Sequence, residues 1–361
     1  MIKPIIFLSV AFICYTFLLT NKKRPHKFWN KQPVSRNTTP AKEGIISKTP
    51  IFNIDLPKDY SFLIEPLIFN SSSMLNLINF INNNFSDHYK YSKQFLYETL
   101  AYPNSTNIQL KHNDKIIGFI HAKPINATIN KKTIEIKYVD FLCVHKKFRS
   151  KNLAALLISK LLSQCSREQV FIFKKETKSL PFNFINQTSY YYIDTTFLKT
   201  TKVNKDTVKF MDATDSKLVY DFITKNSKKY KIFQNFSYEQ FVKIYEESKV
   251  KQILAEYDNQ GNIVGIVIFV EVLFMDSSQP LKTIDIEQIF IDNKITPKIF
   301  DGLIEYAKKN GINIISLLDQ GENKYFIDKY KMFPSLKLYF HMYNYHLLKP
   351  IENTYMGINF L

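Results

Sequence analysis

The segment from Asp140 to Ala154 constrains the fold most, because it joins a short apolar strand to a helix through a basic turn. Apolar residues up to Val144 predict the strand, and the apolar spacing of Leu153–Leu162 predicts the helix. The first backbone N–H groups of a helix have no partner within it and carry partial positive charge, so they bind anions. Full positive charges lie in the same turn, on Lys147, Arg149 and Lys151. The junction therefore predicts a phosphate or pyrophosphate site.

The same order of elements occurs twice along the chain. A turn entering a strand is followed, after a further hairpin's length, by an apolar strand and then by a helix. Such a repetition predicts two similar α/β halves. The paired segments are 113–120 with 259–268, 140–144 with 288–291, and 153–162 with 298–309. Two more helices are predicted over Pro66–Phe85 and Phe95–Leu100. The second half lacks a basic turn, since residues 292–297 are near neutral, so only the first half is expected to bind an anion there.

Composition excludes a disordered chain and gives little support to nucleic-acid binding. Of the 361 residues, 45% are hydrophobic, and the formal net charge is +17. The positive charge is uneven, because residues 1–42 contain eight Lys or Arg and no acidic residue. A basic tract beside an apolar segment is typical of a membrane flank. Nucleic acid is the competing partner, and we do not favour it because the sequence contains no RNA- or DNA-binding motif.

Residues 4–20 form an uncharged, mostly apolar stretch. As a helix it would be about 25 Å long, slightly under the ~30 Å of a bilayer core. The basic residues of 21–24 outweigh Lys3, so the positive-inside rule places the rest of the chain in the cytoplasm. We expect an uncleaved membrane anchor, and the alternative of a cleaved signal peptide stays open.

The three cysteines, Cys14, Cys143 and Cys165, form no C-x-x-C pair and no His/Cys cluster. The spacing therefore gives no support to a zinc site, and an odd count in a long chain favours a reducing compartment over a disulfide framework. Cys143 lies within the apolar strand. We interpret it as a buried small hydrophobic residue rather than a nucleophile.

Four segments together resemble the N-myristoyltransferases. Residues 140–154 are similar to the family pattern EINFLCVHKKLRSKR, with FLCVHKK and RSK identical. Lys27–Val34 resembles the family's FWDTQPV, Glu322–Ile327 resembles ENKTFL, and Tyr343–Tyr345 is similar to the end of YLYNW. The resemblance extends from about Lys27 to Leu361.

The resemblance implies an α/β (α+β) fold, a duplicated acyl-CoA N-acyltransferase (GNAT-like) fold with two pseudo-symmetric halves. It implies transfer of a myristoyl group from myristoyl-CoA to an N-terminal glycine amine, without a permanently bound cofactor or metal, by a monomer. The expected divisions are a membrane anchor (1–20), a basic extended arm with CoA contacts (21–50), an acyl-CoA-binding half (51–200) and a peptide-side half (201–361).

The resemblance also implies site residues for amine acylation by a thioester. Such a reaction needs donors for the developing oxyanion and a base for the amine proton. The implied donors are the backbone N–H groups of Phe141 and Leu142, which a bulge would leave unpaired. The implied base is the terminal carboxylate of Leu361. A free α-carboxylate has a pKa near ~3.5, which burial would raise.

The remaining implied residues bind the acyl donor. The adenine side would be contacted by Lys27, Phe28 and Trp29, and the acyl and pantetheine side by Leu142, Cys143 and Val144. The pyrophosphate loop would comprise Arg149, Ser150, Lys151, Asn152, Leu153 and Ala154. Asn152 replaces a glycine of the usual acyltransferase turn, and Asn tolerates unusual backbone angles. A membrane-interface role for Trp29 is the alternative.

Departures from the family pattern lie on the peptide side. Lys174–Thr177 replaces the family's YTAG, and 84–92 keeps a single acidic residue. Lys331–Leu336 lacks the glycines and aspartate of a family loop, and Asp140 stands where the family has Asn. Weaker binding of basic peptides is therefore expected. Two alternatives stay open: a catalytically weak acyl-CoA-binding scaffold, or an acyltransferase for another amine.

Overall fold

The structure is a computed structural model, and it describes residues 27–37, 39, 42–48, 62–67, 71–86, 89–165, 169–204, 206–275, 279–292 and 298–358. The expected anchor in residues 1–20 and the terminal Leu361 lie outside these ranges. Among the residues within them, no helix is both long and apolar enough to span a membrane.

The predicted repeat is present. In the first half, strands β4 (Thr106–His112) and β5 (Lys115–Ile129) form a hairpin, followed by β6 (Lys132–Val144), helix α4 (Leu153–Ser163) and β7 (Val170–Glu176), which runs parallel to β6. In the second half, β11 (Lys251–Tyr257), β12 (Ile263–Met275), β13 (Pro280–Ile291), α7 (Ile299–Lys309) and β14 (Ile314–Leu318) follow the same order, with β14 parallel to β13. The expectation of a mixed α/β fold with two similar halves is confirmed.

The two halves share one continuous sheet. Strand β15 (Phe333–Tyr343) comes late in the chain, yet it lies between β7 and β8 (Phe184–Asp194). Strand β8 pairs in turn with β14. At the other end, β10 (Ile232–Asn235) pairs with β5 and with β17 (Met356–Gly357). A division of the chain at residue 200 stays a prediction.

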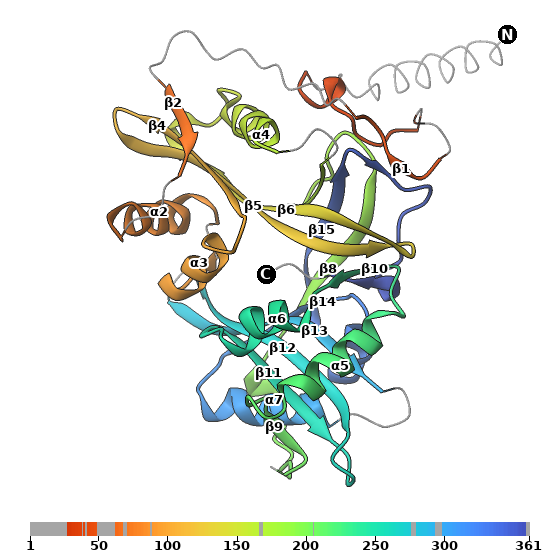
Figure 1. Ribbon diagram of the computed structural model, residues 1–361. Coiled ribbons are helices and arrows are strands. Elements are labelled where there is room, and N and C mark those ends of the chain that lie inside the picture. Colours follow the sequence, from red (N-terminus) through yellow and green to blue (C-terminus); the bar gives the residue numbers. More distant parts are fainter. Residues whose placement is uncertain are drawn as a thin grey trace, which may run out of the picture.

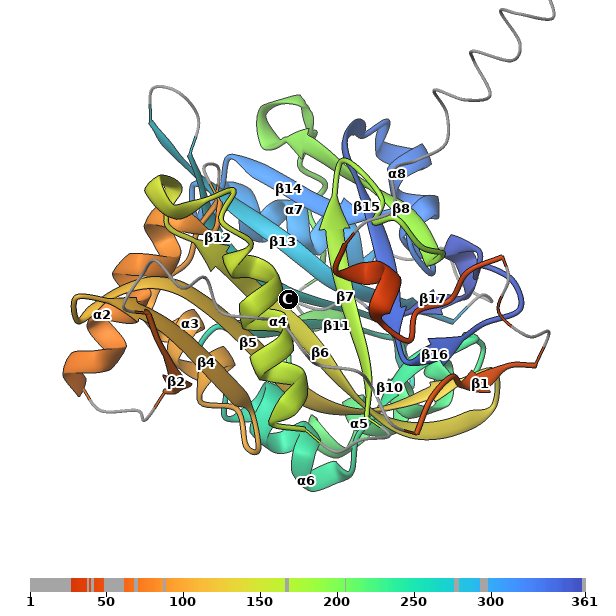
Figure 2. The ribbon, with the colours of Figure 1, turned by 90° about the horizontal axis from the view of Figure 1, so that it is seen from above.

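Helices cover both faces of the first half. Figure 1 shows β5 and β6 crossing the middle of the molecule, with α4 on one side and with α2 (Ser71–Asn84) and α3 (Lys93–Leu100) on the other. Seen from above, α4 lies across β4, β5 and β6 (Figure 2). The helix predicted from Pro66 begins only at Ser71. Pro66 instead ends β2 (Phe62–Pro66), an edge strand on β4, where proline's missing N–H is tolerated.

The remaining elements are short or peripheral. Strands are β1 (Gly44–Ile45), β3 (Tyr89–Lys90), β9 (Val208–Phe210) and β16 (Tyr345–His346); helices are α5 (Ser216–Ser227), α6 (Tyr238–Phe241) and α8 (Asn323–Tyr330). Single turns are η1 (Trp29–Lys31), η2 (Lys146–Phe148), η3 (Thr195–Phe197) and η5 (Asn353–Tyr355), and η4 (Val242–Glu246) is a π-helix.

Candidate functional site

The ladder between β5 and β6 is broken where the sequence predicts it. Phe119 pairs with Cys143, but the next registered pair is His121 with Asp140. Two residues of β6, Phe141 and Leu142, therefore lie opposite a single residue of β5, as in a β-bulge. Phe141 has φ of 50°, a left-handed conformation that is uncommon for a bulky residue. Strand β7 leaves β6 at the same level, because their ladder ends at Val139 and Phe173.

The N–H of Phe141 has a hydrogen-bond partner in this structure, and its role as an oxyanion donor stays a prediction. It donates to Oδ1 of Asp140 at 2.7 Å, while Oδ2 of the same carboxylate accepts from the Tyr138 hydroxyl at 2.9 Å. Burial and the neighbouring Asp140 raise the pKa of Tyr138 well above its ordinary value. The bulge thus removes the Phe141 N–H from the sheet ladder. The N–H then donates to Asp140, which stands where the family pattern has Asn.

Residues after Asp140 alternate between the two faces of β6. Phe141 and Cys143 are buried with α2 and α3, whereas Leu142 and Val144 face the cluster built on α4. Cys143 is a free cysteine, and burial raises the pKa of its thiol although Arg149 opposes this. The interpretation of Cys143 as a buried hydrophobic residue is confirmed.

The predicted anion turn has the required backbone. Ser150 and Asn152 have φ of 69° and 58°, and α4 begins directly after Asn152 without a side-chain cap on its first N–H groups. Left-handed residues that alternate with right-handed or extended ones before a helix turn N–H groups toward one point, where an anion can bind. Leu153 is buried and Ala154 is exposed, so the helix start is anchored on one side and open on the other.

Basic side chains surround this turn in different roles. Arg149 donates to the backbone oxygens of Val144 at 3.2 Å and of Asn84 at 3.1 Å, so it ties the turn to β6 and α2. The Lys151 ammonium lies 5.6 Å from the ring centroid of Phe148. A cavity of about 1030 Å³ opens beside the turn, and its basic lining residues are Lys111, Lys115, His145, Lys146 and Lys147.

The N-terminal arm packs against the same half. Phe28 and Trp29 are buried in one cluster with Val144 and Leu153, while Lys27 is exposed. The Trp29 ring stacks on Phe173 with centroids 5.8 Å apart. Trp29 therefore lies inside the protein, and the membrane-interface alternative is wrong. Two family-like segments also meet here, because Val34 and Tyr343 form a β-bridge.

At the start of α7, the corresponding helix of the second half, a carboxylate of the protein lies where an anion would bind. Oε2 of Glu256 accepts the backbone N–H groups of Lys298 and Ile299, both at 2.8 Å, at the start of α7. Glu256 is buried, and burial raises its pKa despite these hydrogen bonds. A carboxylate at this helix start occupies two of the donors that a phosphate would use and adds a negative charge that would repel it. Residues 293–297 of the turn lie outside the described ranges.

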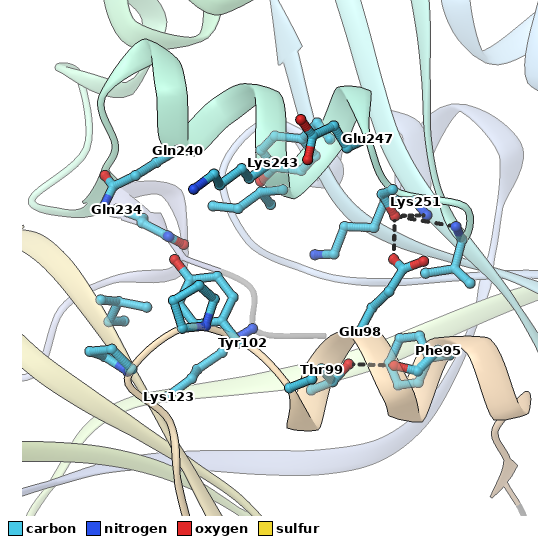
Figure 3. A pocket seen from close by; sticks show the side chains of 18 of the residues that line it. Phe95, Glu98, Thr99, Tyr102, Lys123, Gln234, Gln240, Lys243, Glu247 and Lys251 are labelled. Atoms are coloured by element: carbon cyan, nitrogen blue, oxygen red, sulfur yellow. Dashed lines mark hydrogen bonds between the residues drawn. The ribbon is translucent and has the colours of Figure 1, made fainter. Parts of the chain in front are cut away.

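A second cavity, of about 590 Å³, lies where the halves meet. Figure 3 shows Lys123 of β5 and Lys251 of β11 on opposite sides of it, with Glu98 and Tyr102 from α3 and the segment after it. Lys251 forms an ion pair with the buried Glu287. The other carboxylate oxygen of Glu287 has no hydrogen-bond partner in the described part of the chain.

The peptide-side departures have structural consequences. Lys174 lies with its ammonium 6.0 Å from the Tyr138 ring centroid, whereas Lys175 is exposed. Burial raises the pKa of Asp285 to about 7, and Lys174 opposes the rise. The family loop expected at 331–336 is only a tight turn, since Lys331 caps α8 with φ of 51° and β15 starts at Phe333.

Several of these residues were missed by sequence reasoning. Lys123, Tyr138, Asp285 and Glu287 lie near the bulge or the cavity. Asp140 was identified as a departure from the family pattern and as the first side-chain alternative to the terminal base. A charged residue within a long apolar strand, such as Lys123 in β5, is the feature that could have indicated them. His121, opposite Asp140, stays neutral because burial lowers its pKa to about 3.

Comparisons with known proteins agree with the resemblance. Residues 42–180 match the family model described as Myristoyl-CoA:protein N-myristoyltransferase, N-terminal domain. Glycylpeptide N-tetradecanoyltransferase of Plasmodium falciparum (isolate 3D7) is 28% identical over 169 residues, which are 41% of this chain and 41% of that protein. Glycylpeptide N-tetradecanoyltransferase 1 of Arabidopsis thaliana is 28% identical over 173 residues, 42% of this chain and 39% of that protein. The chain thus matches about two fifths of the length of these relatives.

The fold likeness is more extensive than the sequence likeness. The crystal structure of Saccharomyces cerevisiae N-myristoyltransferase with bound myristoyl-CoA superposes with a TM-score of 0.80, at 18% identity, over 94% of this chain and 100% of that chain. At this identity the likeness establishes the fold, which is the expected duplicated acyltransferase fold. Residues 42–180 are thus similar in sequence to the N-terminal domain of the N-myristoyltransferases, and the chain shares the fold of the yeast N-myristoyltransferase over 94% of its length.

Proposed function

We propose that the chain transfers a myristoyl group from myristoyl-CoA to the N-terminal glycine amine of a peptide or protein. The observation that carries this proposal is the broken ladder at Phe141 and Leu142, followed after ten residues (143–152) by the start of α4, which has no side-chain cap. Donors for an oxyanion and donors for a pyrophosphate are what thioester aminolysis by a CoA ester requires. Both lie within or beside residues 42–180, the segment that the family model matches.

The acceptor would enter through the cavity between the halves. The unpartnered oxygen of Glu287 is suited to an incoming ammonium, and Asp285 lies nearby with a pKa of about 7. The terminal carboxylate of Leu361 remains our proposed base. Its nearest described neighbour, Ile358, is buried in one cluster with Tyr138, and three extended residues reach at most about 10 Å.

The test is intact-mass analysis of Gly-starting peptides after incubation with myristoyl-CoA and the full-length chain. We expect one myristoyl group on the N-terminal amine of neutral peptides, and less on basic ones because of Lys123 and Lys174. Matching peptides that start with an N-methylated glycine serve as controls. Tight acyl-CoA binding with no product from any peptide would contradict the transfer proposal.

A catalytically weak acyl-CoA-binding scaffold is the second candidate. It is favoured by one observation, the hydrogen bond that occupies the Phe141 N–H. An acyltransferase for another amine is the third, and the two lysine side chains near Tyr138 favour it over basic peptides. The peptide panel separates these from the leading proposal.

Arg149 and Lys151 provide a direct check on the acyl-CoA site. Replacing both by Ala is expected to weaken myristoyl-CoA binding, since each charge-assisted phosphate contact is typically worth about 1.5–3 kcal/mol. The loss should shrink at high salt. Calorimetry at two salt concentrations measures both effects. Lys147→Ala and Lys175→Ala serve as comparisons. They show how much the loss of another positive charge alone lowers the affinity for myristoyl-CoA. Unchanged affinity in the double variant would remove the pyrophosphate assignment.

We also propose that residues 1–20 anchor the chain in a membrane with the catalytic domain in the cytoplasm. The support is the apolar span of residues 4–20 and its basic flank. We expect full-length protein to resist carbonate extraction, and a variant lacking residues 1–20 to be extracted. Protease added on the cytoplasmic side of sealed vesicles should digest the domain. Protection of the domain would reverse the proposed orientation.

A further inference from the structure

Lys123 lies beside the bulge. It pairs with Tyr138 across β5 and β6, and its ammonium is 5.7 Å from the Tyr138 ring centroid. Paired residues share a face of the sheet, as do residues two apart in a strand, so Lys123, Tyr138 and Asp140 face the same way. The Tyr138 hydroxyl donates to Asp140, which in turn holds the Phe141 N–H. A continuous chain of contacts therefore joins the Lys123 amine to a predicted oxyanion donor.

The same amine faces the second half of the molecule. Lys123 lines the cavity between the halves, across from Lys251 (Figure 3), and Glu287 lines the same cavity. Burial lowers the pKa of Lys123 to about 8, helped by the positive charge of Lys251, while Glu287 and Asp140 act in the opposite direction. More of the side chain is therefore a neutral amine near pH 7 than for a lysine in water. Only a neutral amine has the lone pair that attacks a carbonyl.

We propose that Lys123 is itself an acyl acceptor, so that the chain acylates its own side chain at the bulge. The inference rests on the proposed binding of myristoyl-CoA at that site. The thioester carbonyl would lie at the bulge and the acceptor must reach it from the cavity, and Lys123 both lines that cavity and lies against Tyr138, three residues before Phe141. An amine held there has the proximity that an external peptide gains only by binding.

The reaction balances without another reactant. The neutral Lys123 nitrogen attacks the thioester carbon, a C–N bond forms and the C–S bond breaks. The products are an amide on Lys123 and free CoA. The proton lost by nitrogen passes to the departing thiolate. The acyl chain remains on the apolar side of the bulge, where Phe141 and Cys143 pack against α2 and α3.

The experiment incubates the purified full-length chain with myristoyl-CoA and no peptide. Intact mass should show one added myristoyl group, and digestion should place it on Lys123. The bond should resist hydroxylamine, which cleaves thioesters, and this distinguishes it from acylation of Cys14, Cys143 or Cys165. Lys123→Arg should lose the modification, while the exposed Lys175→Arg should keep it. Heat-denatured chain should not be modified selectively at Lys123.

Calorimetry with myristoyl-CoA on the same samples separates the possible failures. A wild-type chain that binds the ester but stays unmodified, or is modified elsewhere, overturns self-acylation and leaves the proposed function standing. A wild-type chain that does not bind it contradicts both. Site mapping on the wild type does not depend on the variant's folding. If Lys123→Arg binds the ester normally and is still acylated to the wild-type extent, Lys123 is not the acceptor.

Discussion

Appending Gly-Gly after Leu361 is expected to lower turnover of a Gly-starting peptide by a factor on the order of 10²–10⁴, the usual range for a lost general base. The extension converts the proposed base, the α-carboxylate of Leu361, into an amide and moves the charge by two residues. A base must lie within hydrogen-bond reach of the amine, so a displacement of this size is not tolerated. Single-turnover kinetics with saturating myristoyl-CoA measure the effect.

As a control, myristoyl-CoA binding by the same Gly-Gly chain is measured in parallel with its turnover. The turn at Arg149 is built from β6, α2 and α4, so affinity for myristoyl-CoA should stay within about twofold. Deletion of Leu361 should give the same pattern, because it shortens the reach from the buried Ile358. Wild-type turnover in the Gly-Gly chain would exclude the terminal carboxylate and assign the proton to a side chain.

The part of the site that follows from local sequence was predictable. A polar turn before an apolar helix fixes α4, and Asn152 marks the left-handed residue that its start requires. Phe141 and Leu142 were implied by a family pattern rather than by their own chemistry, since an apolar run also suits an ordinary strand. The structure adds the reason that the ladder fails there, which is the register shift against Ile120.

Long-range placement was not predictable from sequence patterns. Nothing in the sequence of β15 indicates that it inserts between β7 and β8, because alternating apolar residues fix a face and not a neighbour. The same holds for Lys123. A lysine within an apolar strand is unusual, but only the structure shows that it pairs with Tyr138 and that its ammonium lies 5.7 Å from that ring. For α7, the sequence predicts the near-neutral turn before the helix. It does not predict that Glu256 of β11 accepts hydrogen bonds at the start of the helix.

Asp140→Asn has the other large expected effect, and its sign discriminates between two roles. The Asp140 carboxylate accepts the Phe141 N–H at 2.7 Å, so a thioester oxygen that bound the same donor would lie roughly 5 Å from a negative charge. At an effective dielectric constant near 20, two like charges at that distance repel by about 3 kcal/mol. Asn keeps the shape and removes the charge. Turnover is therefore expected to rise about ten- to a hundredfold.

If Asp140 were instead the base, the same substitution would lower turnover by a factor on the order of 10²–10⁴. The control is Asp194→Asn in β8, where Oδ1 also accepts a backbone N–H, that of Thr196 at 2.8 Å, without any link to the bulge ladder. Combined with the Gly-Gly chain, the result is decisive. If Asp140→Asn raises turnover and the Gly-Gly extension abolishes this activity, the terminal carboxylate is the base. The charge of Asp140 then lowers turnover by destabilising the oxyanion. If Asp140→Asn lowers turnover and the Gly-Gly chain stays active, the base is Asp140 of β6.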